Sequence, residues 1–492
     1  MSSSDQSSLD LAFEEVKANN GRLNLGCLEL SSAELTAVAE RLMTRERRKP
    51  LVHVDVSANG LGADCVGALG SLMAFVDPEG QAFSLNVAEN FIGDGGLAGL
   101  LGLLLRVRER VRSLRLGRCG LGQASFEALS EQLGQFPELV LLDLRHNDLS
   151  EVAELGGLLG AGLESLLLSN CQLSQEGIAH LAERLGGDAA LCKLELDSNA
   201  ISNESARALC LAVGLNSSLK GLQLSSCHLA QGASLLLDAL RANEVLTHLD
   251  LRSNEINDIA AENLAAGLAE NRALLFLDLA SNFISNRGIA CLASALRTNS
   301  TLQYLMLDRN RCSDGGVLAL AEALPANSTL LHLALDQNQI TSAGGTHLAT
   351  ALLSNAGLTH LSSCSNPLGD DCAEAFSRSL SHNSFLKSLH LDTCELSLTG
   401  VRLILDALTT NSTLTSLALG SLHRQGFDAQ VLSSIYCQLS GNPSLLKLRI
   451  PVGNSTFMPL LHRNKANQRN LETTLFMLLM ERDVLMFDLD EK

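Results

Sequence analysis

Leucines recur along the chain in a fixed pattern that a polar residue closes. The segment 246–254 reads LTHLDLRSN, or LxxLxLxxN, and the same pattern returns three more times downstream. The closing asparagines are 28 residues apart and lie at Asn254, Asn282, Asn310 and Asn338. The two leucines of LxL are two residues apart, so they point to the same face of a β-strand. The pattern therefore predicts one short strand in each 28-residue unit.

The closing position extends this ladder in both directions. Upstream it is held by Leu28, Asn59, Asn90, Cys119, Asn147, Cys171, Asn199 and Cys227, and downstream by Asn366, Cys394, Leu422 and a degenerate Gly453. An asparagine amide can bond backbone groups of its own turn and of the neighbouring turn, and cysteine is a small residue that tolerates burial. The ladder predicts about 15 or 16 repeats. Most steps are 27 to 31 residues, and one step, from Asn147 to Cys171, is 24.

The second half of each repeat has the periodicity of a helix. In the segment 288–299, Ile289, Leu292 and Leu296 have helical spacing, and alanines between them permit close packing. Asn299 lies near the end of this helix, where we expect the left-handed conformation. Helices are wider than strands, so parallel strands joined by helices should curve. The prediction is an α/β solenoid, a horseshoe with a parallel concave sheet and convex helices.

These features together resemble the ribonuclease-inhibitor class of leucine-rich repeats. The resemblance rests on the 28-residue unit, the LxxLxLxx(N/C) strand motif, the alternation of Asn and Cys, and the GxxxLAxxLxxN helix, and it covers roughly residues 20–455. It implies binding of a protein through the concave face or the rim. That use is common to the ribonuclease inhibitor, the Ran GTPase-activating protein, the ligand-sensing ends of NOD-like receptors and repeat subunits of ciliary complexes. A shared fold does not choose among these functions.

The two ends of the chain have the pattern of caps. Residues 1–22 predict an N-terminal cap helix, residues 23–453 the leucine-rich-repeat solenoid, and residues 454–492 a C-terminal helical cap. The first cap has an apolar stripe at Leu9, Phe13 and Val16, with acidic residues elsewhere. Terminal repeats need a polar outer face to stay soluble. We therefore expect one solenoid domain closed at both ends.

Composition supports thin repeated layers and narrows the range of partners. Among 492 residues, 46% are hydrophobic but only 3% are aromatic, whereas one large core would use more rings. The formal net charge is −18, from 36 Lys and Arg against 54 Asp and Glu. Such a chain repels phosphate backbones and anionic lipid. We expect no nucleic acid and a protein partner that carries a basic patch.

Cysteine usage and apolar runs indicate a soluble protein in a reducing compartment. The 13 cysteines are an odd number and form no CxxC pair or zinc-binding spacing. The first eight residues have no apolar signal core, and the most apolar run, 97–105, is too short for a bilayer. The expectation is a cytoplasmic protein, in a cytoskeletal or flagellar setting if the ciliary resemblance holds, with free thiols, no cofactor and no metal.

The non-leucine positions around LxL are the candidate partner-binding residues, because they project from the concave face. They are His248, Asp250, Arg252, Phe276, Asp278, Tyr304, Met306, Asp308, His332, Asp336, His360, His390 and Asp392. An acidic line starting at Asp197 runs through them and encloses a small group of Phe276, Tyr304 and Met306. Large anchors surrounded by charge are typical of interface hot spots. The alternative is a solvated face on which Phe276 packs against its neighbours.

Three further patterns have ordinary structural explanations. His332, His360 and His390 come from successive strands about 4.8 Å apart, which permits a metal site, but surface histidines are more common. The glycine-rich segment 93–99 lacks the Gly-Lys-Ser/Thr ending of a phosphate loop and predicts a turn into a helix. Four matches to the glycosylation pattern are better explained as turn chemistry; they begin at Asn299, Asn327, Asn411 and Asn454.

The predicted function is a non-catalytic scaffold for protein–protein interaction. No Ser/His/Asp or Cys/His group can be located in the sequence. One alternative is a GTPase-activating protein similar to the Ran activator, which would orient its partner's catalytic residues. That family carries a long acidic tail, and this chain ends with only Asp488, Asp490 and Glu491. A second alternative is a structural subunit of a large assembly, such as a cilium or flagellum.

Overall fold

The computed structural model describes residues 21–43, 50–77, 80–160, 162–230, 232–420 and 439–450. The apolar stripe of the predicted N-terminal cap, the whole C-terminal cap, and the ladder positions Leu422 and Gly453 lie outside the described residues. The chain divides into two compact units. The first runs to Cys312 and includes Glu322–Leu330, and the second contains Ser313–Ala321 and the residues from Leu331 onward.

The described repeats each contribute one strand of three to five residues, and the strand order follows the sequence from β1 to β16. Within each unit the paired strands are parallel. The first unit contains β1 Arg22–Asn24, β2 His53–Asp55, β3 Phe83–Asn86, β4 Val111–Arg115, β5 Leu141–Asp143, β6 Ser165–Leu167, β7 Lys193–Glu195, β8 Gly221–Gln223, β9 His248–Asp250, β10 Phe276–Asp278 and β11 Tyr304–Met306. The second contains β12 His332–Ala334, β13 His360–Ser362, β14 Ser388–His390, β15 Ser416–Ala418 and β16 Lys447–Arg449.

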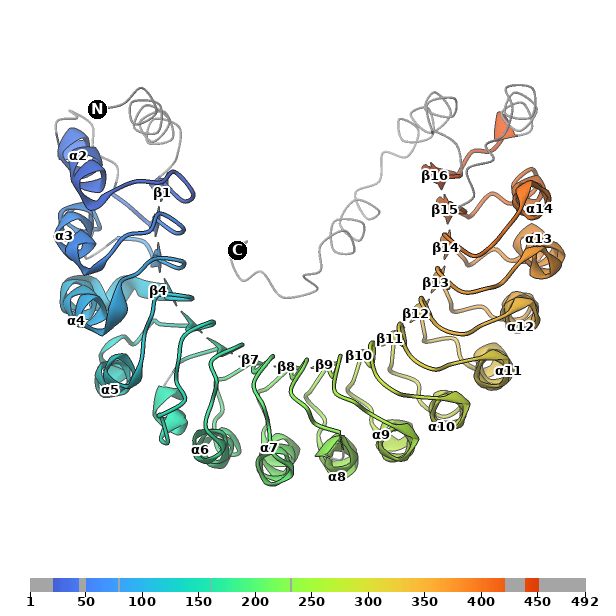
Figure 1. The fold of residues 1–492 in the computed structure, drawn as a ribbon, viewed down its shortest axis with the longest axis horizontal. Helices are drawn as coiled ribbons and strands as arrows, with labels where there is room; N and C mark the ends of the chain where they lie inside the picture. Colours follow the sequence, from blue (N-terminus) through green and yellow to red (C-terminus); the bar gives the residue numbers. More distant parts are fainter. Residues whose placement is uncertain are drawn as a thin grey trace. The chain divides into compact units, whose positions relative to one another are not determined.

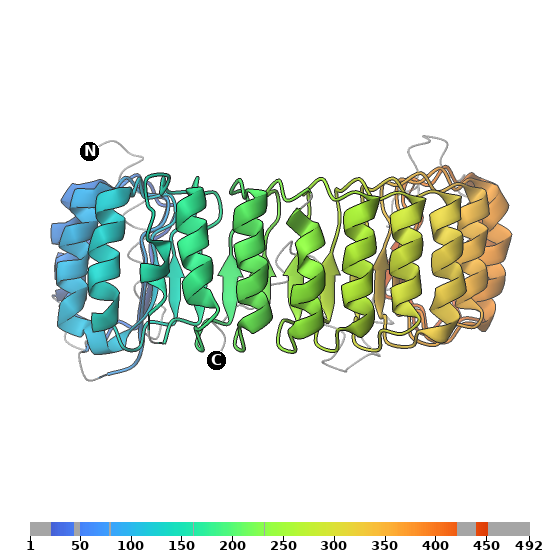
Figure 2. The same cartoon turned by 90° about the horizontal axis from the view of Figure 1, so that it is seen from below.

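The helices follow the strands and lie on the opposite side of the chain path within each unit (Figures 1 and 2). The α-helices are α2 Ser32–Met43, α3 Val66–Met73, α4 Gly93–Leu104, α5 Gln123–Gln132, α6 Gln175–Leu185, α7 Asn203–Leu215, α8 Leu236–Ala242, α9 Asp258–Glu270, α10 Asn286–Leu296, α11 Asp314–Ala323, α12 Ser342–Leu352, α13 Ala373–His382 and α14 Leu398–Ala407. Short 3₁₀ helices are η1 Ala63–Cys65, η2 Leu105–Arg110, η3 Leu133–Gln135, η4 Leu155–Leu158, η5 Gly232–Leu235, η6 Leu324–Ala326 and η7 Asp370–Cys372. The predicted leucine-rich-repeat solenoid is confirmed.

The middle leucine of each strand carries the core, as the LxL pattern predicts. Leu249, Leu277 and Leu305 occupy the same register in β9, β10 and β11 and are fully buried. Burying a leucine side chain stabilises a fold by about 1.5–3 kcal/mol. Because side chains alternate along a strand, the residues before and after each of these leucines point to the face away from the helices. In the first unit, this face lies on the inner side of the curve and is called the concave face below (Figure 1).

One repeat does not form the helix that we expected in every second half. The 24-residue step between Asn147 and Cys171 contains only the single 3₁₀ turn η4. The repeat is too short for a strand, two turns and a full helix. Glycine is required in η4, because a Cβ atom on Gly156 would lie 2.9 Å from the carbonyl oxygen of His180 in helix α6. The prediction is therefore wrong for this repeat, where the neighbouring helix occupies the space.

The closing asparagine joins adjacent repeats, as the sequence predicts. The amide oxygen of Asn282 accepts hydrogen bonds from the backbone N–H groups of Asn254 and Ile256, both at 2.9 Å. Its amide nitrogen donates to the carbonyl oxygens of Leu251, Leu279 and Ala280 at 3.0 to 3.1 Å. One side chain thus satisfies five backbone groups of two turns, which would otherwise be buried without partners.

Cysteine fills the same position with weaker bonds. The thiol of Cys227 donates to the carbonyl oxygen of Leu196 at 3.2 Å and accepts the backbone N–H of Asn199. Burial raises the pKa of Cys227 to about 12, and it has the same effect on Cys119 and Cys171. These cysteines are protonated at neutral pH and hold the ladder as thiols.

A second asparagine ladder joins the turns that follow the helices. The amide nitrogen of Asn299 donates to the carbonyl oxygens of Leu268 (2.8 Å) and Asn271 (3.1 Å). Its amide oxygen accepts the N–H groups of Thr301 and Leu302. The expected left-handed conformation at Asn299 is wrong, since Asn299 is not among the described residues with positive φ. The turn-chemistry interpretation of this glycosylation-like sequence is confirmed, because both ends of the buried amide are in use; Asn327 and Asn411 repeat the arrangement, and Asn454 lies outside the described residues.

Thiol accessibility tests this arrangement. In the native protein at pH 8, we expect iodoacetamide to modify the exposed Cys27 rapidly. The ladder thiols of Cys119, Cys171 and Cys227 should react only after denaturation, because they are buried and protonated. Mass spectrometry of peptides from native and urea-treated protein gives the measurement. Rapid native labelling of Cys227 would contradict the ladder.

Candidate protein-binding site

The predicted site residues of the first unit lie together on the concave face of strands β7 to β11 and the turns that follow them. This surface is called the β7–β11 strip. Its side chains are Lys193, Glu195, Asp197, Gln223, Ser225, His248, Asp250, Arg252, Phe276, Asp278, Tyr304, Met306 and Asp308. The register places the first, third and fifth positions of each repeat in three parallel rows.

Three rings form the first row. His248, Phe276 and Tyr304 are register partners on β9, β10 and β11. The rings of His248 and Phe276 are stacked, with centroids 5.8 Å apart and an interplanar angle of 22°. Phe276 and Tyr304 follow with centroids 6.1 Å apart and a tilt of 41°. All three side chains are half-buried, so one side of the row remains open to solvent.

The membership of this row differs from the predicted group of Phe276, Tyr304 and Met306. Met306 is the register partner of Asp278 and lies in the second row. His248 takes its place beside Phe276, and burial lowers the pKa of the His248 imidazole, so the ring stays neutral at physiological pH. The signal for His248 was available, because 28 residues separate each of the three rings in the sequence.

Buried carboxylates form the second row. Asp250 and Asp278 are each 7% exposed, although we expected a solvated acidic line. Arg252 lies between them, with Nη2 3.0 Å from Asp250 Oδ2 and Nε 3.3 Å from Asp278 Oδ2. The second oxygen of Asp278 accepts the backbone N–H of Ala280 at 2.8 Å. Neighbouring side chains of adjacent strands cover these carboxyl groups, which a single-strand pattern does not reveal.

The strip holds more negative than positive charge. Burial raises the pKa of Asp278, and repulsion from Asp250 raises it further. Burial also raises the pKa of Asp197 to about 6, with Asp250 and Glu195 adding to the effect. The strip carries five acidic side chains and two basic ones; the acidic ones are Glu195, Asp197, Asp250, Asp278 and Asp308, and the basic ones Lys193 and Arg252. One guanidinium therefore serves a group of carboxylates that would accept another cation.

A neighbouring cluster on β5 to β7 is balanced instead. Arg145 lies 2.8 Å from Asp143 and 3.5 Å from Glu195, and Lys193 lies 2.7 Å from the other oxygen of Glu195. Two cations here match two carboxylates. The unbalanced part of the strip is thus the region of Asp197, Asp250 and Asp278, beside the ring row.

The second unit presents histidines at its corresponding positions. The rings of His332 and His360 are stacked with centroids 5.5 Å apart, and His390 is hydrogen-bonded to the hydroxyls of Ser388 and Ser416. His332 is only 7% exposed, so its interpretation as a surface histidine is wrong. In the described part of the chain, no three His, Cys, Asp or Glu side chains are grouped so as to hold a metal ion.

The predicted aspartates of the second unit bond to their own turns. Asp336 accepts the backbone N–H of Cys364 at 2.6 Å and the hydroxyl of Ser362. Asp392 accepts the N–H of Gly420 at 2.6 Å and lies 3.4 Å from the guanidinium of Arg449. These two carboxylates therefore stabilise the sheet turns in addition to lining the face.

Acidification is expected to destabilise the second unit through its histidines. Burial lowers the pKa of His332 to about 3 and that of His360 to about 4, so the fold favours their neutral forms. The stabilisation is complete above the unfolded pKa near ~6.5 and is lost as the pH falls toward 4. We expect the free energy of unfolding to fall by roughly 1–3 kcal/mol between pH 7 and pH 4 from these groups.

Urea unfolding at a series of pH values measures this effect. The variant His332→Gln should flatten the pH dependence, whereas His382→Gln, which changes an exposed side chain of the same unit, should leave it unchanged. Equal slopes for the wild type and His332→Gln would refute the role of the buried histidine.

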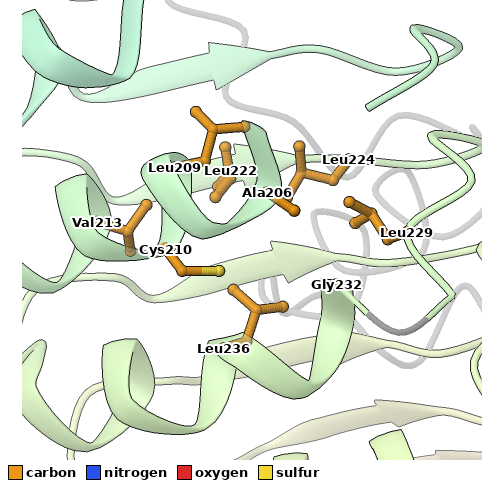
Figure 3. A pocket seen from close by; sticks show the side chains of 9 residues that line it. All are labelled: Ala206, Leu209, Cys210, Val213, Leu222, Leu224, Leu229, Gly232 and Leu236. Atoms are coloured by element: carbon orange, nitrogen blue, oxygen red, sulfur yellow. The ribbon is translucent and has the colours of Figure 1, made fainter. Parts of the chain in front are cut away.

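The only apolar gap of note beside the strip is too small for a ligand. It lies between α7, β8 and α8, and its lining includes Leu209, Cys210, Leu222 and Leu236 (Figure 3). The space for the centre of a water-sized sphere is about 10 Å³. Figure 3 shows side chains of α7 and α8 facing each other across it. We interpret the gap as imperfect packing where the helical segment is divided into η5 and α8.

Comparison with known proteins agrees with this geometry. The leucine-rich repeat family model matches residues 242–265 and 326–349. The ribonuclease inhibitor of Mus musculus is 35% identical over 196 residues, covering 38% of this chain and 42% of the inhibitor. The chain is a leucine-rich-repeat protein of the ribonuclease-inhibitor-like family. Leucine-rich-repeat proteins generally mediate protein–protein interactions.

Other relatives of this leucine-rich-repeat protein have different overall compositions. The NACHT, LRR and PYD domains-containing protein 5 of Homo sapiens is 29% identical over 250 residues, covering 49% of this chain and 21% of that protein. The chain thus spans less than half the length of these relatives. Among solved structures, an internalin of Listeria monocytogenes has a TM-score of 0.46 and 16% identity, covering 85% of this chain and 95% of the internalin. No helix in the described part of the chain is long and apolar enough to cross a membrane.

Proposed function

We propose that this protein is a non-catalytic scaffold that binds a protein partner through the β7–β11 strip, and that the partner presents a basic patch. The observation that carries the proposal is the half-open row of His248, Phe276 and Tyr304 beside carboxylates that lack enough cations. Rings supply large contact area at low conformational cost, and desolvated charges next to them set specificity. A basic partner would cover the first and neutralise the second.

Electrostatics favour such a partner at long range as well. The formal net charge of −18 attracts basic proteins and accelerates their encounter. At short range, a partner cation placed beside Asp278 or Asp197 would relieve the carboxylate repulsion that raises their pKa values. The gain is largest where the strip is most unbalanced.

A binding role, rather than catalysis, fits the way the polar groups of the strip are used. Asp250 and Asp278 already bond Arg252 and the backbone N–H groups of Arg252 and Ala280. A general base needs a substrate proton within hydrogen-bond reach and a pKa suited to transfer. Carboxylates engaged in strand turns are rigid contact groups.

We also propose a cytoplasmic location. The supporting observation is that ladder cysteines such as Cys227 contribute to the fold as buried thiols, and the cysteines of the described residues are unpaired. Reducing compartments preserve such thiols, whereas oxidising ones favour disulfides.

Affinity capture tests the proposed function. The tagged full chain should retain a protein from cell extract, and the purified pair should bind with 1:1 saturation in calorimetry. Addition of a small GTPase loaded with GTP should produce no acceleration of hydrolysis in single turnover. Acceleration of hydrolysis, or a captured protein that binds equally well after the strip is altered, would refute the proposal.

A further inference from the structure

We propose that the β7–β11 strip binds an arginine side chain of the partner, with its guanidinium stacked on the rings of Phe276 and Tyr304 and hydrogen-bonded to the adjacent aspartates. This inference rests on the proposed function and names the chemistry of the contact. The surface that carries it is the juxtaposition of a ring row and a carboxylate row on the same strands.

The spacing of the two rows suits a flat cation on a long stem. Phe276 and Asp278 are two residues apart on β10, which separates their positions by about 6–7 Å along the strand. A guanidinium that covers a ring face within about 6 Å of its centroid can also direct its edge toward a carboxylate in the next row. The half-buried rings leave one side open for this stacking.

The charge around the rings favours a cation. The titratable and charged groups facing this position are Lys193, Glu195 and Asp197 of the β7 repeat, His248, Asp250 and Arg252 of the β9 repeat, Asp278 of β10 and Asp308 of the β11 repeat. The acidic groups outnumber the cationic ones, and His248 is neutral. Arg252 already bridges Asp250 and Asp278, so the incoming cation fits best on the Tyr304 side of the row.

Arginine is favoured over lysine because of the rings. A guanidinium is planar, weakly hydrated and able to stack while it donates several hydrogen bonds, whereas an ammonium is a strongly hydrated point charge. The same unit contains such a pair elsewhere: the guanidinium carbon of Arg311 lies 4.5 Å from the ring centroid of Phe283. That contact is on a different part of the repeat and provides a matched control position.

Two peptides of equal charge, hexa-arginine and hexa-lysine, test the inference by fluorescence polarisation with the full chain at physiological salt. We expect hexa-arginine to bind roughly three- to tenfold more tightly. In the variant Phe276→Leu/Tyr304→Leu, the apolar volume stays but the rings are lost, so the preference should disappear while hexa-lysine binding remains. Phe283→Leu should leave the preference unchanged.

Each outcome has a distinct meaning. Equal affinities for the two peptides, or a preference that survives Phe276→Leu/Tyr304→Leu, would overturn the arginine site. If binding of both peptides still depends on Asp278, as measured with Asp278→Asn, the proposed function stands without the stacking. If neither peptide binds the wild type, both the arginine site and the basic-partner proposal fail. Circular dichroism confirms that each variant is folded.

Discussion

Replacing Asn282 by alanine is expected to lower the free energy of unfolding by about 2–5 kcal/mol. The substitution removes five hydrogen bonds and leaves buried backbone groups of two repeats without partners. An unsatisfied buried polar group costs about 1–3 kcal/mol, and relaxation of the turn recovers part of the loss. Because repeats are stabilised by their neighbours, the damage also weakens the interface on each side. Urea denaturation followed by circular dichroism gives the measurement.

Asn203→Ala is the matched control. Asn203 is exposed at the start of α7 and takes no part in either ladder, so its replacement should change the free energy of unfolding by less than about 0.5 kcal/mol. Similar denaturation curves for Asn282→Ala and Asn203→Ala would show that the ladder does not stabilise the solenoid.

The double variant Phe276→Ala/Tyr304→Ala is expected to weaken binding of the captured partner by about 2–4 kcal/mol, or roughly 30- to 1,000-fold. The two rings lie side by side in the centre of the β7–β11 strip, where a partner would remove them from water. The loss should appear mainly as faster dissociation, because ring contacts form after encounter. Surface plasmon resonance separates the two rates.

Phe385→Ala serves as the control for this effect. Phe385 is a partly exposed ring that follows helix α13 in the second unit, away from any strand face. Its removal should not change partner affinity. A double variant that binds as tightly as Phe385→Ala would exclude the ring row as an interface hot spot.

The repeated parts of the fold could be predicted from the sequence, since the same physical requirement returns every 28 residues. The buried Leu277 and the bridging Asn282 recur as identical letters, so one repeat explains the next. The burial of Asp278 could not be predicted in this way. It depends on side chains of neighbouring strands that differ from repeat to repeat, and above all on the position of Arg252.

A longer-range pairing was visible in the sequence but required knowledge of which residues meet. Asp314 at the start of α11 accepts the N–H groups of Thr341 and Gly344 in the following repeat, at 2.8 and 3.0 Å. A Cβ atom on Gly344 would lie 2.5 Å from the Asp314 carboxylate, so glycine is required there. Asp258 with Gly288 repeats this arrangement. The 30-residue spacing of Asp and Gly is thus a packing signal between repeats.

The irregular repeat marks the limit of periodic reasoning. The segment between Asn147 and Cys171 keeps the strand and ladder positions but has lost the helix. Its length alone was a warning. The form of the replacement, a 3₁₀ turn whose Gly156 packs against α6, is set by tertiary contacts.

A photo-crosslinking amino acid placed at position 304 tests most directly whether the strip binds the partner. Irradiation of the complex should join the partner to this position, on the concave face of β11, and not to a probe at Leu215, which is exposed on helix α7. Crosslinking at 215 with none at 304 would contradict the proposed binding face.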